Sequence, residues 1–125
     1  MKISKDLEQN IQHLKSILKS EDITFLEEHI GHTKAMLVFV NDLVNKESLG
    51  ELILRPASQF NDELDEKSFF QLFLSPEKKR IFDLNELVSE VVSGSAVLIA
   101  DTLSVGISFK LFKSERNANR KSVCN

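Results

Sequence analysis

The polar residues best placed for chemistry follow the most apolar stretches of the chain. Residues 35–40, AMLVFV, run directly into Asn41 and Asp42, and a second apolar run, residues 96–100, ends at Asp101. Ligands of open α/β sheets bind beyond the carboxyl ends of parallel strands, where loops and helix N-termini meet. Amide and carboxylate side chains at these positions are therefore candidates for a small-molecule site, but the residues alone favour a turn at Asn41 and Asp42 and the start of a hairpin at Asp101.

Motifs for catalysis or cofactor binding are missing from the sequence. His29 and His32 stand three residues apart, but no nearby cysteine or third histidine completes a zinc site. The four glycines are isolated from one another and form no phosphate-binding loop. Cys124 lies in a polar tail that offers nothing to activate its thiol. We therefore expect a protein that is not an enzyme and that binds neither a cofactor nor a metal.

Length and composition indicate one soluble globular domain. The chain has 125 residues, of which 42% are hydrophobic and 28% are charged, with a net charge of -3. An acidic balance argues against non-specific nucleic-acid binding, which needs a basic surface. The longest apolar runs, residues 35–40 and 96–100, are much shorter than the roughly 20 residues that span a bilayer. The single cysteine forms no disulfide within the chain, so a cytoplasmic location is expected.

Helical spacing of apolar residues predicts several helices. The clearest covers residues 83–94, where Asp83 and Glu86 have the spacing of a capping box. A shorter helix is expected over residues 22–30, ended by Gly31 in a left-handed conformation. The other expected segments are a helix over residues 4–19, a helix that contains Leu49, Leu52 and Ile53 and ends at Arg55-Pro56, a polar surface loop or frayed helix over residues 57–67, and a helix around residues 69–73 before Pro76.

The two continuously apolar segments, residues 35–40 and 96–100, predict strands that are covered on both faces. The helices between them imply a right-handed crossover, which would make these strands a parallel pair. Residues 105–112 alternate in polarity and predict a hairpin with residues 96–100. The expected fold class is α/β, a small mixed sheet with a parallel central pair and a C-terminal hairpin, flanked by helices. Residues 1–113 form this single domain, and residues 114–125 form a polar, basic tail.

Four stretches of the sequence, in this order, carry a family resemblance: LEQNIQHLKSIL, SEDITFLEEHI, AMLVFVNDLVNKESLGELILRPAS and VVSGSAVLIADTLSVGISF. Together they resemble the N-terminal portion of the A subunit of spore germinant receptors, the GerA-type family. The resemblance covers residues 7–112. Its most specific parts are the strand followed by Asp-Leu-Val and ILRP, and the Ser-Gly-small-apolar run at residues 93–100. One departure is Thr102, because the family has a glycine directly after the acidic turn residue, here Asp101.

The resemblance implies a soluble region of two α/β subdomains, of which this chain matches the first. In that family a membrane domain follows, and the receptor works with other germinant receptor subunits in the inner membrane of the spore. Such receptors detect small nutrients and start germination. The resemblance therefore implies a non-enzymatic part of nutrient sensing that is soluble by itself, has no transmembrane segment of its own, and reaches the membrane through the receptor complex.

By resemblance, the polar corner after residues 35–40 would hold a small germinant, with an amino acid or a nucleoside favoured over a sugar. The chain has no Trp or Tyr, the residues that stack best on a sugar ring. The residues expected to bind the germinant are Asn41, Asp42, Asn45, Arg55 and Asp101. The alternative is a scaffold that only assembles receptor subunits, and an exposed surface formed by Phe69, Phe70 and Phe73 would favour it.

Overall fold

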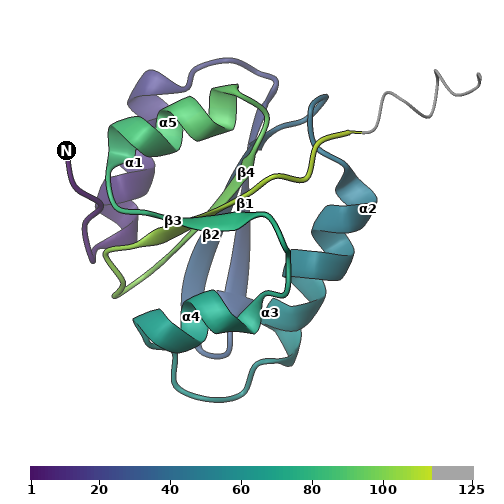
Figure 1. Cartoon of the computed structure of the whole chain (residues 1–125). Helices are drawn as coiled ribbons and strands as arrows, with labels where there is room; N and C mark the ends of the chain where they lie inside the picture. Colours follow the sequence, from purple (N-terminus) through teal and green to yellow (C-terminus); the bar gives the residue numbers. More distant parts are fainter. Residues whose placement is uncertain (114–125) are drawn as a thin grey trace, which may run out of the picture.

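The computed structural model describes residues 1–113, which fold into a five-stranded sheet between two layers of helices (Figure 1). The strand order is β1-β2-β4-β5-β3, and each neighbouring pair is antiparallel. The strands are β1 Ile23–Ile30, β2 Thr33–Val40, β3 Lys78–Ile81, β4 Ala96–Ala100 and β5 Gly106–Phe109. The predicted tail, residues 114–125, lies outside the described residues.

Two groups of helices cover the two faces of the sheet (Figure 1). On one face lie α1, Leu7–Ile17, and α5, Leu84–Val92. On the other face lie α4 and a continuous helical segment that runs from α2 through η1 into α3. Their bounds are α2 Lys46–Leu49, η1 Gly50–Leu54, α3 Arg55–Gln59 and α4 Glu66–Leu72. The predicted α/β fold with helices on both faces of the sheet is confirmed.

Side chains of the central strands alternate between two separate cores. In β2, Leu37 packs into the core beneath the segment α2–α4, whereas Val38 packs into the core beneath α1 and α5. In β4, Leu98 and Ile99 divide between the cores in the same way. None of these four side chains is more than 1% exposed. Because helices shield both faces of the sheet from water, the middle of β2 and the whole of β4 are apolar at every position.

The predicted parallel pair is wrong, because β2 and β4 are antiparallel neighbours. The prediction missed β3, whose sequence KKRI is too charged to suggest a strand. Strand β3 forms an edge of the sheet, where charged side chains discourage pairing with further strands. Helix α5 then crosses back to β4, which runs in the same direction as β3 but is separated from it by β5. The predicted hairpin of β4 and β5 is confirmed.

Residues 22–30, predicted as a helix, form strand β1 instead. Strand β1 pairs with β2 along its whole length, ending with Ile30 opposite Thr33. This pairing outweighs the helical spacing of apolar residues, and isoleucine, threonine and phenylalanine are residues that favour strands. Gly31 does adopt the predicted left-handed conformation, with a φ of 64°. It forms the two-residue turn of a hairpin, however, and not the end of a helix.

The helix predicted to stop at Arg55-Pro56 continues to Gln59. Within η1 the hydrogen bonds have the wider π-helical spacing, and the Arg55 N–H donates to the Gly50 carbonyl. This wider turn lies directly before Pro56, which has no N–H to donate. Pro56 stands in the first turn of α3, but because α3 continues η1 directly, it lies within the helical segment and interrupts its ladder of hydrogen bonds.

The other three predicted helices are confirmed as α1, α4 and α5, with bounds that differ by a few residues. Each begins at an aspartate whose carboxylate accepts N–H groups of the first turn, and these caps are Asp6, Asp65 and Asp83. Hydrogen bonds from the backbone N–H groups of Ser68 and Asn85 lower the pKa of Asp65 and Asp83, respectively. The negative charge also interacts favourably with the helix dipole.

One polar contact joins α5 to two strands of the sheet. Glu90 of α5 accepts a hydrogen bond from Ser108 Oγ of β5 at 2.7 Å and pairs with Lys79 Nζ of β3 at 2.9 Å. Burial disfavours the ionised form of Glu90, but the contacts with Ser108 and Lys79 outweigh it, so the pKa of Glu90 lies below its ordinary value. The same ion pair raises the pKa of Lys79. Ionised Glu90 therefore helps hold the helix on the sheet.

The turn after β4 contains a residue in a conformation that favours glycine. Thr102 has a φ of 70° and is the only described residue besides glycine with a positive φ. Its N–H donates to the Lys5 carbonyl at 2.8 Å, so the turn also supports the segment before α1. The family resemblance implies a glycine here, and the backbone keeps the left-handed conformation with threonine in place.

Replacing Thr102 with glycine is expected to raise the free energy of unfolding by up to about 1 kcal/mol. A left-handed conformation costs an L-residue roughly 1–2 kcal/mol, and the greater freedom of glycine in the unfolded chain offsets about half of that. Urea denaturation of Thr102→Gly measures the change. As a matched control, Thr33→Gly in β2 should lower stability by about 0.5–1 kcal/mol. A loss of stability in Thr102→Gly would contradict the left-handed assignment.

Glu90→Gln should lower stability at neutral pH, and the difference from the wild type should shrink in acid. The pKa of Glu90 is lower in the folded protein than the ordinary 4.5, so its contribution is complete above that value. It is lost as the pH falls through the folded-state pKa. Denaturation midpoints at a series of pH values test this, with Glu21→Gln, an exposed glutamate, as the control. A wild-type advantage that persists unchanged well below pH 4.5 would refute it.

Candidate functional site

The structure does not bring the five predicted ligand residues together. Asn41 and Asp42 follow the end of β2, whereas Asp101 lies beside Lys34 near the start of β2, where its N–H donates to the Lys34 carbonyl at 2.8 Å. The six strand residues 35–40 lie between Lys34 and Asn41, so these two positions are about 23 Å apart. The antiparallel pairing of β2 and β4 causes this, since it places the end of β4 opposite the beginning of β2.

Two of the predicted residues make contacts that support the fold at the corner after β2. Asn41 Oδ1 accepts a hydrogen bond from the Thr24 hydroxyl at 2.6 Å. Asn45 is the N-cap of α2, and its Oδ1 accepts the Ser48 N–H at 3.0 Å. These contacts fix the corner between β2 and α2. Asp42, in contrast, is an exposed turn residue.

Asp101 has a structural contact of its own at the other end of the sheet. Its Oδ1 accepts the N–H of Leu7, the first residue of α1, at 3.1 Å. Two aspartates therefore serve the N-terminus of this helix, because Asp6 is its N-cap. The role of Asn41, Asp42, Asn45 and Asp101 in ligand binding stays a prediction.

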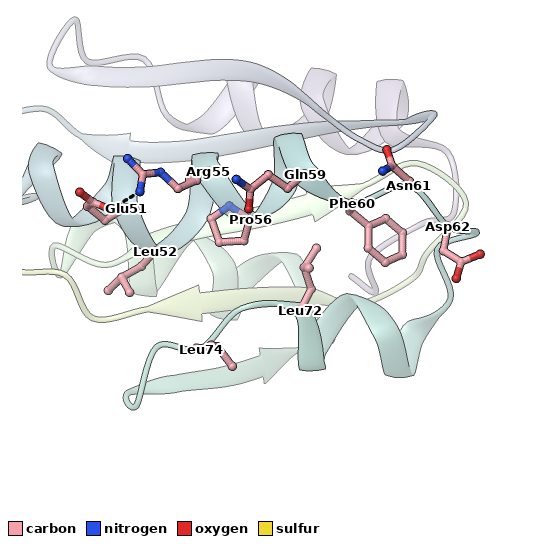
Figure 2. Close-up of a pocket in the computed structure, with 10 residues that line it drawn as sticks. All are labelled: Glu51, Leu52, Arg55, Pro56, Gln59, Phe60, Asn61, Asp62, Leu72 and Leu74. Carbon is pink, nitrogen blue, oxygen red and sulfur yellow. Dashed lines mark ion pairs between the residues drawn. The ribbon is translucent and has the colours of Figure 1, made fainter.

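The fifth predicted residue, Arg55, borders a groove of about 720 Å³ between the helical segment η1–α3 and the end of α4. Figure 2 shows Leu52 and Pro56 on one side of this groove and Leu72 and Leu74 on the other. Leu74 is 82% exposed, the largest value for any large apolar side chain in residues 1–113. The groove combines these apolar side chains with polar and charged residues, among them Arg55 and the carboxylates of Glu51 and Asp62. Small-molecule sites also combine apolar walls with polar groups.

Local sequence explains how the groove forms. The chain is extended at Phe73, with a φ of -99° and a ψ of 127°, and the side chain of Phe73 is fully buried. Because neighbouring side chains of an extended segment point in opposite directions, Leu74 is directed away from the core. On the opposite side of the groove, the helix continues from Arg55 through Pro56 to Gln59, and Arg55 lies at the rim.

The electrostatics of the groove are simple. Arg55 Nη1 pairs with Glu51 Oε1 at 3.4 Å, one turn apart on the helix, and both side chains are more than half exposed. Such a pair contributes little to stability and can exchange partners readily. The guanidinium can bind a carboxylate through two parallel N–H bonds. Together with the leucines, it could hold a molecule that has an acidic group and an apolar part.

Sequence reasoning found only one residue of this groove. It placed Arg55 at the end of a helix and assigned residues 57–67 to a surface loop or frayed helix, of which residues 57–59 belong to α3. No local pattern marks Leu72 and Leu74 as groove residues, because Leu72 belongs to α4 and is partly buried, whereas Leu74 is exposed only because the chain leaves the helix at Phe73.

Two other kinds of site are not found in the described part of the chain. His29 lies on β1 and His32 in the turn that follows. Within residues 1–113, no three His, Cys, Asp or Glu side chains are grouped so that they could hold a metal ion. Nor does any helix in the same range have the length and apolar character needed to cross a membrane.

Comparison with known proteins decides the family. The family model of the Bacillus/Clostridium GerA spore germination protein matches residues 9–123, which is nearly the whole chain. The chain belongs to the GerA family of spore germination proteins. A search of curated proteins finds no match for this GerA-family chain.

A solved structure has the same fold as the GerA-family chain. It is the crystal structure of the N-terminal domain of the A subunit of the Bacillus megaterium spore germinant receptor GerK3, with a TM-score of 0.69 and 18% sequence identity. The match covers 92% of this chain and 49% of the GerK3 chain. This GerA-family chain therefore spans about half the length of the solved domain.

Mutation of the corner should separate structural residues from an exposed one. Asn45→Ala removes the cap of α2 and should lower the free energy of unfolding by about 1 kcal/mol. Asp42→Ala should change it by no more than about 0.5 kcal/mol, as is usual at the surface. Chemical denaturation of both variants tests the assignment, and equal losses in the two would show that the corner is held differently.

Proposed function

We propose that the chain is the first part of the N-terminal domain of a spore germinant receptor A subunit and takes part in sensing a small nutrient germinant. Membership of the GerA family and the fold shared with the GerK3 domain support this proposal. In this proposal, the partners of the chain are the other receptor subunits, and the receptor complex lies at the inner membrane of the spore. The domain acts by binding and not by catalysis.

The observation that carries the sensing role is the groove beside Arg55. It combines an exposed guanidinium with the apolar side chains of Leu52, Leu72 and Leu74. A free amino acid has a carboxylate for the guanidinium and, in many cases, an apolar side chain for the leucines. This chemistry favours an amino acid over a nucleoside, which lacks the acidic group, and over a sugar, which lacks both features.

A role restricted to assembly is less well supported. The aromatic surface that would favour it is not exposed, because Phe69 and Phe73 are fully buried and their rings pack edge to face. Phe70 is partly buried and lies against cationic groups, with Arg80 Cζ 3.9 Å and Lys78 Nζ 4.3 Å from its ring centre. These three rings hold α4 on the sheet.

Ligand-observed NMR of the 125-residue chain against amino acids, nucleosides and sugars tests the proposal. We expect saturable binding of an amino acid at millimolar concentration, at least tenfold weaker in Arg55→Gln because a charged hydrogen-bond partner is lost. The substitution should leave the fold intact, since the pair with Glu51 is exposed.

Lys46→Gln is the matched control, because it removes a positive charge from the same helical segment away from the groove. Binding should survive this change. Binding that is equally strong in Arg55→Gln would place the germinant elsewhere, and no binding by any compound in the panel would refute a sensing site within this chain.

A further inference from the structure

The two edges of the sheet are protected to different degrees. Strand β3 forms one edge, and three of its four residues, KKRI, are charged. Strand β1 forms the other edge with eight residues, ITFLEEHI. It contains neither lysine nor proline, the residues that commonly prevent an edge strand from pairing with another chain. Within residues 1–113, only β2 pairs with β1, so the outer side of β1 is open.

One hydrogen bond shows which backbone groups of β1 face outward. The Asn41 N–H donates to the Asp22 carbonyl at 2.8 Å, so Asp22 faces β2. Successive residues of a strand face opposite edges, so the even-numbered residues of β1 bond to β2 and the odd-numbered ones face away. The outward row consists of Phe25, Glu27 and His29, and we call the N–H and C=O groups of these three residues the β1 edge. In the described part of the chain, no hydrogen bond uses these groups.

The β1 edge can pair with the same edge of a second copy. Opposite residues of an antiparallel pair face the same side of the sheet, and a two-fold dimer uses one surface twice. With Leu26 on the two-fold axis, Phe25 lies opposite the second copy's Glu27, and these two residues exchange N–H···O bonds in both directions. His29 lies opposite the second copy's Ile23 and can donate to its carbonyl. The outward residues of both copies then have hydrogen-bond partners, and the two sheets become one.

Charge selects this register of the two strands. Lys15 Nζ of α1 lies 5.4 Å from the centre of the Phe25 ring, on the face of the sheet to which Glu27 also points. Opposite side chains have Cβ atoms about 5 Å apart, so the second copy's Glu27 comes within reach of Lys15. A register centred on Glu27 would instead place two carboxylates opposite each other, and one centred on Phe25 would leave His29 beyond the end of β1.

We propose that the β1 edge joins two copies of this chain into a dimer, with Leu26 on the axis and Lys15 of each copy paired with Glu27 of the other. The edge favours a second copy because the chain itself supplies both members of this ion pair. Pairing also covers Phe25 and Leu26, which are only partly buried in one copy. The dimer does not depend on nutrient binding, since β1 contributes no residue to the groove beside Arg55.

Sedimentation velocity of the 125-residue chain tests for the dimer. Because the contact is one strand wide, we expect a monomer–dimer equilibrium with a Kd of about 1–100 µM. The dimer should weaken as salt is raised, since salt screens exposed ion pairs. A chain that is still monomeric at about 1 mM, ten times the weakest expected Kd, would overturn the proposal.

Charge reversal tests the register. Lys15→Glu and Glu27→Lys should each weaken the dimer about tenfold, because each turns two attractions across the axis into repulsions. The double variant Lys15→Glu/Glu27→Lys restores opposite charges and should recover most of the affinity. Lys46→Glu, at an exposed position of α2, is the control and should dimerise like the wild type. Single variants that dimerise normally, or a double variant weaker than both, would overturn the proposed pairing.

Hydrogen exchange locates the interface. When the concentration of the chain is raised from about 10 µM to about 1 mM, exchange of the Phe25, Glu27 and His29 amides should slow about 4–10-fold. This slowing follows from the smaller fraction of chain that is monomeric at the higher concentration. A dimer in which these three amides stay unprotected would show that the copies meet elsewhere and would overturn the proposal.

The Arg80 amide is the matched control, because it faces outward on the other edge of the sheet. The Lys110 N–H donates to the Glu77 carbonyl, so the odd-numbered residues of β3 face β5 and Arg80 faces away. Exchange of this amide should not depend on concentration. Protection of Arg80 in place of the β1 edge would assign the dimer to β3 and would also overturn the proposal.

Discussion

The fold depends on the complete burial of the two central strands, β2 and β4. Leu37, Val38, Leu98 and Ile99 point alternately to the two faces of the sheet and are all shielded from water. Each face must therefore have its own layer of helices, because a bare face would expose a row of apolar side chains. This constraint places α1 and α5 on one side and the helices of residues 46–72 on the other (Figure 1).

The groove beside Arg55 follows from the way the second layer is built. Helix α4 and the segment η1–α3 both pack on the same face of the sheet, and the groove lies between the segment and the end of α4. Leu74 is left uncovered there. The first layer closes differently, because α1 and α5 contact each other as well as the sheet, and Glu90 adds a polar contact to β3 and β5.

The sequence predicted those elements whose signals are local. Asp83, the apolar stripe of α5 and the uninterrupted runs in β2 and β4 each depend on a few neighbouring residues, and all were placed correctly. Strand β1 was missed because the spacing of its apolar residues suits a helix, although its partner β2 follows directly after a two-residue turn. Strand β3 was missed because its partner β5 lies far along the chain. The direction of β4 relative to β2 was wrong for the same reason, and so Asp101 was expected at the wrong end of the sheet. Arg55 was found, but Leu72 and Leu74 on the other side of its groove come from a later segment of the chain, which no local pattern indicates.

The hydrogen bond from Leu7 to Asp101 has a consequence for synthesis of the protein on the ribosome. It joins residues 94 positions apart, and Thr102 makes a similar contact with Lys5. The first helix to be translated therefore acquires its final anchors only after nearly all of the described chain has been made. Until then its apolar stripe has no finished sheet to cover, so the nascent domain remains open and exposed to chaperones and proteases for most of its translation.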